Sequence, residues 1–227
     1  MNLIKKQAIG LLERATSKYG TITGIRHSAE ADILEIDLHL PQADMEKWES
    51  APYIKVKVGD MVYRDYSPTM WDSQTRTCSL IIDTSHYGPG SLWCQKVKAG
   101  NRITYLAIAP TNHKPILSGN TFCVGDISSI GHFLAMEQLA LTKVCFSGFI
   151  MFNNQKQLHE FKCNYNTALT AVLASDLNET QRRINDYHLT NQTVYIAGNT
   201  SNMTQLRRYI KQQQSFEGIV KLKGFWS

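Results

Sequence analysis

The fold of this chain is decided by two short segments, Arg64-Asp-Tyr-Ser-Pro-Thr69 and His86-Tyr-Gly-Pro-Gly-Ser-Leu-Trp93. The first lies at the end of an alternating run, which predicts a β-strand. Residues two apart in a strand point to the same face, so we expect Arg64 and Tyr66 to share one cleft. An arginine fork suits phosphate, and a tyrosine face suits an aromatic ring system. A plain surface strand is the alternative for this segment taken alone.

The second segment predicts a tight glycine- and proline-containing loop that opens a helix. Ser91 is placed where it can cap that helix. The free N–H groups of a first helical turn bind phosphate without a positive side chain. A plain strand-to-helix turn is the alternative for this stretch alone. The two segments in this order are a more specific signal than either one.

The first half of the chain has the pattern of a β domain. A helix is expected over residues 3–18 and a short one within residues 41–50. Alternating runs predict strands over residues 33–40, 53–58, 61–66, 77–83 and 102–108. Short strands separated by turn signals indicate an antiparallel sandwich or barrel.

The pattern changes near residue 118. Strands are expected over residues 121–124, 144–152, 194–198 and 219–226, and helices over residues 128–141, 179–187 and 203–213. The apolar pattern of residues 167–174 fits either a strand or a helix. Strands that alternate with helices predict a parallel sheet with ligands at its carboxyl edge. The expected domains are residues 1–117, with the N-terminal helix, and residues 118–227.

Composition excludes several classes of protein. The chain has 227 residues, of which 43% are hydrophobic and 19% charged, and a net charge of +5. This balance favours a folded core over disorder. No apolar run approaches the roughly 18 residues that cross a bilayer, so no membrane insertion is expected. No block of like charges suggests a nucleic-acid arm, and no secretion signal is recognised, so a cytoplasmic protein is expected.

The sequence contains no motif for a metal site, a disulfide framework or a hydrolase. The five cysteines include no C-x-x-C pair, and the seven histidines show no H-x-x-x-H or H-E-x-x-H spacing. The chain also lacks the G-x-S-x-G elbow of hydrolases and the P-loop. We therefore expect neither a disulfide framework nor a metal site.

Taken together, the two segments resemble the flavin-binding signature of the ferredoxin-reductase superfamily. The chain is most similar to the siderophore-interacting protein family, FAD-dependent reductases of ferric siderophores. The similarity covers most of the chain from about Gly24 onward and is loose over residues 155–191. The shared motifs are His86 with Gly88–Trp93, Val124-Gly-Asp126, Tyr195-Ile-Ala-Gly-Asn199, a helix with Arg207 or Arg208, and Gly224-Phe-Trp226.

The resemblance implies a fold and a set of site residues. The implied fold is an antiparallel FAD-binding β-barrel followed by a small parallel-sheet α/β domain. Tyr66 and Ser67 would be catalytic, with Tyr66 stacked on the isoalloxazine and Ser67 near its N5 atom. The residues implied in cofactor binding are Arg64, Tyr66, Ser67, Thr69, Asp83, His86, Gly88, Gly90, Ser91, Leu92, Trp93, Gly125, Asp126, Ser128, Ala197, Gly198, Asn199, Phe225 and Trp226.

Within that set the resemblance assigns different parts of the cofactors. Arg64 and the Gly88–Leu92 loop would hold the FAD pyrophosphate. Gly125-Asp126 and the Ala197-Gly198 turn would line the side where NADH or NADPH enters. Phe225 and Trp226 would cover part of the flavin ring or the adenine.

The sequence departs from the family pattern on the nicotinamide side. Thr69 stands where the family has a second arginine, and Asn199 stands where it has a glutamate. The acid and proline that usually follow the first strand of the second domain are replaced by Ser128-Ser129-Ile130. FAD binding is thus better supported than nicotinamide binding, and a ferredoxin-like protein is an alternative electron donor.

The expected function is reduction of Fe(III) held in a siderophore chelate, which releases Fe(II) for iron acquisition because siderophores bind Fe(III) far more tightly. A flavin reductase with another acceptor, such as ferric haem or a redox protein, is one alternative. A flavin- or chelate-binding module without catalysis is the other. A rim with Lys55, Lys57, Arg76 and Lys114 is a candidate for attracting an anionic chelate, against the simpler interpretation of a solvated face.

Overall fold

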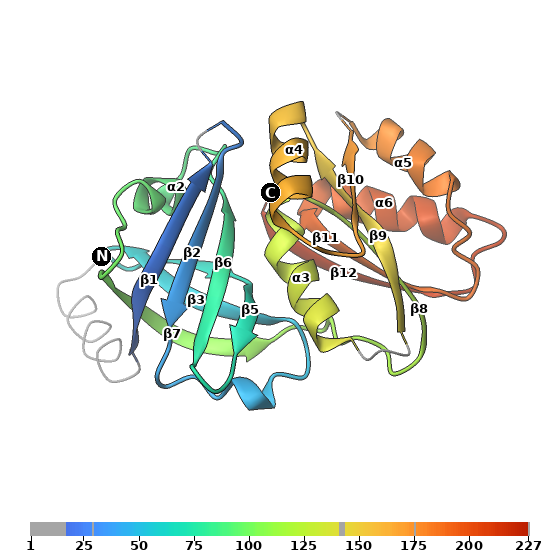
Figure 1. Cartoon of the computed structure of the whole chain (residues 1–227). Helices are drawn as coiled ribbons and strands as arrows, with labels where there is room; N and C mark the ends of the chain where they lie inside the picture. The colour runs from blue at the N-terminus through green and yellow to red at the C-terminus, as the bar shows by residue number, and fades with distance from the viewer. Residues whose placement is uncertain (1–16, 29, 141–143, 175, 227) are drawn as a thin grey trace, which may run out of the picture.

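The first half of the protein is a sheet of seven antiparallel strands (Figure 1). The computed structural model describes residues 17–28, 30–140, 144–174 and 176–226. The strands are β1 (Lys18–Ser28), β2 (Ile33–His39), β3 (Pro52–Gly59), β4 (Val62–Tyr66), β5 (Pro68–Asp72), β6 (Thr77–Asp83) and β7 (Arg102–Pro110). A 3-10 turn, η1 (Met45–Lys47), and a short helix, α2 (Pro89–Cys94), complete this half.

The order of the strands requires the sheet to roll into a barrel. The order is β4-β3-β7-β1-β2-β6-β5, so β4 and β5 are the two edges. In the chain these edges are separated by Ser67 alone. One residue spans at most about 3.6 Å, so the sheet has to curl until its edges meet at Ser67. The predicted antiparallel barrel is confirmed.

Two strands of the barrel, β1 and β5, are not predicted from the sequence. Strand β1 contains Gly20 and Gly24, which weaken its alternating pattern, and β5 begins with Pro68. The helix expected over residues 3–18 lies mostly outside the described residues, and Lys18 already belongs to β1. The helix expected within residues 41–50 is the 3-10 turn η1.

The second half is a parallel sheet of five strands with helices on both faces (Figure 1). Its strands are β8 (Gly119–Asp126), β9 (Val144–Phe152), β10 (Thr170–Leu173), β11 (Thr193–Asn199) and β12 (Ile219–Trp226), in the order β10-β9-β8-β11-β12. The helical segments are η2 (Ile127–Ser129), α3 (Ile130–Leu139), α4 (Gln155–Asn164), α5 (Leu177–Asn185) and α6 (Thr200–Gln212).

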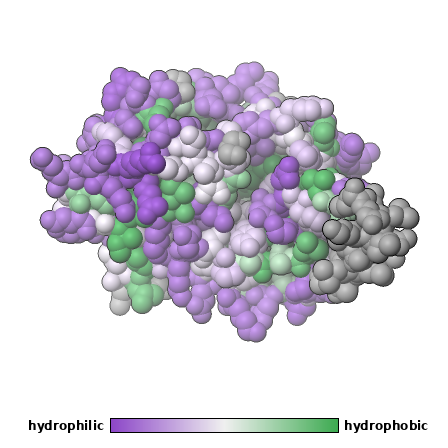
Figure 2. Space-filling view, turned by 180° about the vertical axis from the view of Figure 1, so that it is seen from behind, coloured by the Kyte–Doolittle hydropathy of each residue, from purple (hydrophilic) through white to green (hydrophobic). Residues whose placement is uncertain are grey.

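Helices α3 and α4 lie on the side of this sheet that faces the barrel, while α5 and α6 lie on the other side (Figure 1). The predicted parallel α/β arrangement is confirmed, and residues 167–174, whose pattern fits either a strand or a helix, contain strand β10. No helix among the described residues is long and apolar enough to cross a membrane. Seen from behind, the described surface is mostly hydrophilic, with apolar side chains in small separate areas (Figure 2).

The first turn of α3 packs against the barrel where the two edges meet. A Cβ on Gly131 would lie 3.1 Å from the carbonyl oxygen of Ser67, so glycine allows this close approach. At the other end of α3, the Gln138 amide makes two hydrogen bonds to the backbone of Trp71, at 3.2 and 2.8 Å. The halves of the chain are therefore held together by direct contacts, while a domain boundary between residues 117 and 118 remains a prediction.

A buried pair of histidines lies behind this interface. His113, in the segment between β7 and β8, and His132, on α3, are both fully buried, and their Nδ1 and Nε2 atoms are 2.8 Å apart. Burial, helped by the positive charges of Lys221 and Lys223, lowers the pKa of His113 to about 3. Burial also lowers the pKa of His132 well below its usual value. Both rings are therefore neutral at physiological pH.

This pair predicts acid sensitivity of the fold. Unfolded histidines take up protons below about pH 6.5, whereas folded His113 does so only near pH 3. The unfolded state therefore binds more protons in this interval, and the free energy of unfolding falls as the pH is lowered. The expected contribution of His113 is about 1.4 kcal/mol per pH unit, measured by urea unfolding between about pH 5 and 6.

The matched variants are His113→Phe and His27→Gln, because His27 is an exposed histidine on β1. The first substitution is expected to flatten the pH dependence more than the second. Equal slopes in the wild type and in His113→Phe would show that His113 is not a buried neutral group.

Candidate functional site

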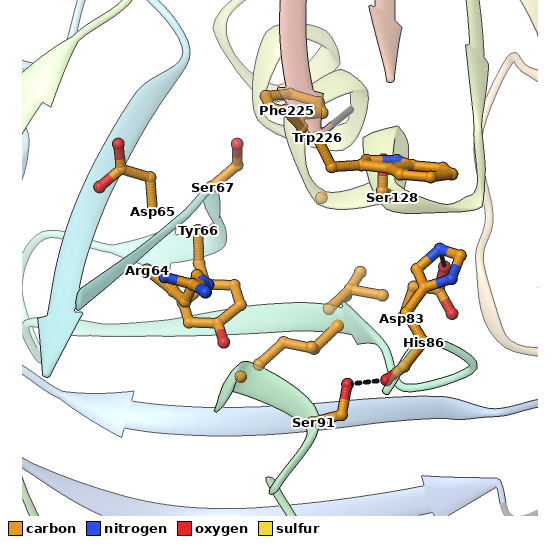
Figure 3. A pocket seen from close by; sticks show the side chains of 14 residues that line it. Arg64, Asp65, Tyr66, Ser67, Asp83, His86, Ser91, Ser128, Phe225 and Trp226 are labelled. Carbon is orange, nitrogen blue, oxygen red and sulfur yellow. Dashed lines mark hydrogen bonds and ion pairs between the residues drawn. The ribbon is translucent and has the colours of Figure 1, made fainter. Parts of the chain in front are cut away.

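A cavity of about 190 Å³ opens beside the corner of the barrel and extends to the end of β12 (Figure 3). In the figure, Arg64 and Tyr66 lie together on one side, and Asp83, His86 and Trp226 on the other. The lining residues come from both halves of the chain: Arg64, Asp65, Tyr66, Ser67, Ile81, Ile82, Asp83, His86, Gly90, Ser91, Ser128, Gly131, Phe225 and Trp226.

Tyr66 is held in position by its neighbours. Its ring stacks with Trp93, with 6.1 Å between the centroids and 25° between the planes. Burial raises the pKa of the Tyr66 phenol well above its usual range, so the group stays protonated. A Cβ on Gly90 would lie 2.8 Å from the Tyr66 hydroxyl oxygen, closer than carbon and oxygen tolerate. Glycine at position 90 therefore permits the tyrosine to sit where it does.

Arg64 presents an exposed guanidinium at the same end of the cavity. Its Nη1 donates to the carbonyl oxygen of Tyr63 at 2.8 Å. Within the described part of the chain, no carboxylate forms an ion pair with it. The remaining donors of the fork are thus available to an anion.

The 86–91 loop differs in one respect from the sequence prediction. Helix α2 begins at Pro89, and its N-cap is Gly88, in extended backbone and without a side-chain hydrogen bond. Ser91 is not the cap, because the helix starts before it. Its hydroxyl instead donates to the carbonyl oxygen of His86, which closes the loop (Figure 3). Open space surrounds the Cβ position of Gly88.

Three side chains form the opposite wall. His86 Nε2 lies 3.2 Å from the carboxylate oxygen Oδ2 of Asp83, whose side chain is almost buried. The rings of His86 and Trp226 lie against each other, with centroids 4.5 Å apart. Trp226 is 39% exposed, so an aromatic surface remains open at the end of β12.

Among the second-half residues predicted to bind a cofactor, Asp126, Gly198 and Asn199 contact one another and connect two strands of the sheet. Asp126 accepts from the backbone N–H of Ser128 at 3.0 Å and from that of Asn199 at 2.7 Å, which ties β8 to β11. Gly198 has φ +139° and packs against the same carboxylate, a position that favours glycine. Burial raises the pKa of Asp126 despite these hydrogen bonds.

The predicted residues thus divide into two groups. Arg64, Tyr66, Ser67, Asp83, His86, Gly90, Ser91, Ser128, Phe225 and Trp226 line the cavity. Outside its lining are Thr69, Gly88, Leu92, Trp93, Gly125, Asp126, Ala197, Gly198 and Asn199. The Thr69 side chain is fully buried, and its hydroxyl has no hydrogen-bond partner within the described ranges.

A second hollow, of about 120 Å³, lies beyond Trp226. It lies at the carboxyl ends of strands β8 to β10, the edge where the sequence predicts ligands of a parallel sheet. Of the residues implied on the nicotinamide side, Asp126 lines this hollow, and Gly125, Ala197 and Gly198 do not. Three carboxylates, of Asp83, Asp126 and Asp176, line it. The helix N-termini beside it are already capped: Asp176 accepts from the N–H of Glu179 at 2.8 Å, and Asn199 from that of Asn202 at 3.0 Å.

A third hollow, of about 320 Å³, shares five residues with the cavity: Arg64, Asp65, Tyr66, Ser67 and Phe225. Tyr53, Lys55, Tyr63, Lys223 and Gly224 complete its lining. The Lys223 ammonium lies 5.3 Å from the centroid of the Tyr53 ring. Lys55 pairs with Asp65 at 2.7 Å. This hollow thus combines aromatic faces with positive charge.

The basic rim suggested by the sequence is mostly elsewhere. Of its members, Lys55 lines the third hollow, and Lys57 does not. Lys114 pairs with Glu49 at 2.6 Å, and Arg76 donates to the carbonyl oxygen of Pro41 at 2.5 Å. Sequence reasoning missed Lys223, although it directly precedes the Gly224-Phe-Trp226 motif.

Comparisons with known proteins place this geometry in context. No protein-family model and no curated protein matches the chain in sequence. Solved structures do match. The siderophore-interacting protein of Acinetobacter baumannii has a TM-score of 0.75 at 13% identity, over 92% of this chain and 89% of that one. The siderophore-interacting protein of Aeromonas hydrophila has a TM-score of 0.73 at 12% identity, over 93% of this chain and 91% of that one.

Phthalate dioxygenase reductase has a TM-score of 0.73 at 16% identity, over 92% of this chain and 69% of that one. That protein is described as a modular structure for electron transfer from pyridine nucleotides to a [2Fe-2S] cluster. At these identities the likeness concerns the fold alone. The chain has the fold of siderophore-interacting proteins and of ferredoxin-reductase-like electron-transfer modules.

Proposed function

We propose that this protein is an FAD-dependent reductase that passes electrons to Fe(III) held in a siderophore chelate. The observation that carries the proposal is the convergence of Arg64, Tyr66 and Ser67 with the 86–91 loop and Phe225-Trp226 around one cavity. The fold is that of electron-transfer proteins, which supports a flavin-type redox role.

The residues present fit FAD. Tyr66 offers a protonated, rigidly packed ring for stacking, and the uncapped backbone near Gly88 and the Arg64 fork offer donors for phosphate oxygens. The cavity alone is smaller than the roughly 300–1,000 Å³ typical of ligand pockets. FAD would therefore extend across the exposed faces of Trp226 and the loop.

When bound, FAD would supply the redox chemistry, since it accepts electrons in pairs and releases them singly. The chain would orient the ring system between Tyr66 and the Phe225-Trp226 end of β12. Ser67, at the corner of the barrel, would present a hydroxyl group to the ring edge. Phe225 and Trp226 would limit the access of water to that face.

The third hollow is the proposed acceptor site. It adjoins Tyr66 and Ser67, so a chelate bound there would lie next to the flavin ring. Lys223 and Arg64 favour an anionic ligand, while Tyr53 and Tyr63 favour one with flat apolar surface. A negatively charged, aromatic iron chelate meets both conditions.

The second hollow does not fit a nicotinamide dinucleotide well. Its carboxylates would repel a pyrophosphate, and at each neighbouring helix N-terminus one N–H group already donates to the cap residue, Asp176 or Asn199. This favours a protein of the ferredoxin kind as the electron donor over NADH or NADPH.

FAD retention tests the cavity directly. The isolated protein is expected to be yellow or to become so with added FAD. Tyr66→Ala is expected to raise the dissociation constant for FAD about 10- to 100-fold, since stacking on an aromatic ring is worth roughly 1–3 kcal/mol. Arg64→Ala should raise it about tenfold or more through loss of a charged hydrogen bond. Both constants follow from fluorescence titration of the apoprotein.

Two controls make this comparison specific. Tyr66→Phe keeps the ring and should bind FAD nearly as the wild type does. Arg102→Ala removes an exposed arginine of β7 that stacks on Tyr19, outside the cavity, and should have no effect. Normal FAD occupancy in Tyr66→Ala and Arg64→Ala would overturn the assignment of this cavity to a flavin.

The electron donor can be identified by anaerobic bleaching of the flavin absorption. Reduced ferredoxin is expected to bleach the FAD-loaded protein rapidly, and equal concentrations of NADH or NADPH more slowly. Rapid bleaching by either nucleotide would show that the acidic second hollow accepts a dinucleotide after all.

The acceptor site makes a charge-dependent prediction. Lys223→Glu is expected to raise the KM for ferric tris(catecholate) about fivefold, the effect of roughly 1 kcal/mol in aqueous electrostatics, while a neutral ferric hydroxamate is much less affected. Steady-state reduction assays at low ionic strength measure both. Lys211→Glu, an exposed lysine on α6, is the matched control. Equal effects of the two substitutions would remove the third hollow from the acceptor path.

A further inference from the structure

A chain of three polar side chains runs from the cavity into the protein interior. Ser67 Oγ lies 3.5 Å from Nδ1 of His132, and Nε2 of His132 lies 2.8 Å from Nδ1 of His113. The chain ends at Nε2 of His113, a buried atom with no hydrogen-bond partner among the described residues. The residues come from the barrel corner, from α3 and from the segment that joins the halves.

The surroundings of the two rings contain few other polar groups. Phe133 and Phe225 lie edge-on to His132, with centroids 5.5 and 5.3 Å away. Tyr195 lies edge-on to His113 at 5.1 Å, and its own hydroxyl donates to the carbonyl oxygen of Lys114. The charges that act on the pair are those of Lys221 and Lys223. Both rings are neutral, so each carries one N–H proton.

Two arrangements of these protons are possible. In the first, Nε2 of His132 donates to Nδ1 of His113, and the other N–H of His113 is buried without an acceptor. In the second, Nδ1 of His113 donates to Nε2 of His132, and Nε2 of His113 carries only a lone pair. The second arrangement is favoured, because it leaves no N–H donor buried without an acceptor at Nε2 of His113, and orphaned buried N–H groups are rare in folded proteins.

The second arrangement has a consequence for Ser67. His132 then carries its proton on Nδ1 and donates it toward Ser67 Oγ. The serine oxygen accepts that bond, so its own O–H remains free to donate into the cavity that Ser67 lines. In the first arrangement the Ser67 O–H instead donates to Nδ1 of His132. The contact of 3.5 Å is longer than most hydrogen bonds between side chains, so full donation to Ser67 requires the two side chains to move slightly closer.

We propose that His132, held by His113, is a positioning residue that makes the Ser67 hydroxyl a hydrogen-bond donor to the ligand in the cavity. The histidine pair transfers no proton and undergoes no net reaction. It determines whether the Ser67 O–H donates to His132 or to the ligand in the cavity. For the flavin the proposal rests on the function proposed above, with the ring nitrogen N5 as the acceptor.

The first test needs no flavin. Two-bond ¹H–¹⁵N spectra of ¹⁵N-histidine-labelled apoprotein are expected to show both His113 and His132 protonated on Nδ1 and bare on Nε2. Signals are assigned by their loss in His113→Gln and in His132→Gln. Finding both rings protonated on Nε2 would overturn the proposal, whether or not the protein binds FAD.

The second test uses amides that imitate one ring nitrogen at a time. An Asn side chain reaches about as far as Nδ1, and a Gln side chain about as far as Nε2. His132→Asn should therefore keep a donor for Ser67, while His132→Gln should keep only the contact to His113. The readout is the ¹⁵N chemical shift of [¹⁵N5]FAD bound to each variant.

Ser67→Ala and His132→Gln are expected to move the N5 resonance in the same direction and by similar amounts, with no further shift in the double variant. His132→Asn should stay near the wild-type position. A purely structural role predicts the opposite order, because Gln is closer to histidine in volume. A wild-type N5 shift in His132→Gln would refute the positioning role, and failure of all variants to bind FAD while the tautomers are as expected would count against the flavin site alone.

Discussion

The single residue between β4 and β5 is the constraint on which the site depends. Because the two edges of the rolled sheet are joined through Ser67, the chain must place Arg64 and Tyr66 on one side of this corner and bury Pro68 and Thr69 on the other. The first turn of α3 then packs on the Ser67 carbonyl oxygen through Gly131. The corner thus belongs to the barrel core, to the interface between the halves, and to the lining of the cavity and of the third hollow.

Charge is distributed unequally around this corner. Arg64 and Lys223 face the third hollow, whereas Asp83, Asp126 and Asp176 face the second. At the end of β12, Phe225 lines the third hollow and Trp226 lines the second. Anionic ligands are therefore favoured on one side of the aromatic pair and disfavoured on the other. In the interior behind them, burial keeps His113 and His132 neutral, so the lysine charges act on a hydrogen-bonded pair that carries no charge of its own.

Local pattern predicted those elements in which one face is buried. Strands β2 and β3 alternate between buried and partly exposed residues, as the sequence suggested. Helix α4 was not predicted, because its composition is polar and few of its residues are buried. The predicted capping role of Ser91 was wrong because the helix begins at Pro89. A serine side chain can also hydrogen-bond a nearby backbone carbonyl group, as Ser91 does with that of His86. The position of Lys223 beside a hollow could not be predicted, because a single lysine in a strand occurs equally at ligand sites and on solvated faces.

The sequence by itself determined the two-part architecture and the segments that carry Arg64, Tyr66 and the glycine loop, because alternation, helical spacing and turn residues are local properties of the chain. Only the tertiary structure decided which of the expected residues meet in one cavity, that Asp126 and Gly198 brace the sheet, and that two histidines nineteen positions apart form a buried pair behind Ser67. These features depend on contacts between segments distant in sequence, and on burial, which changes the chemistry of a side chain without leaving a trace in its neighbours along the chain.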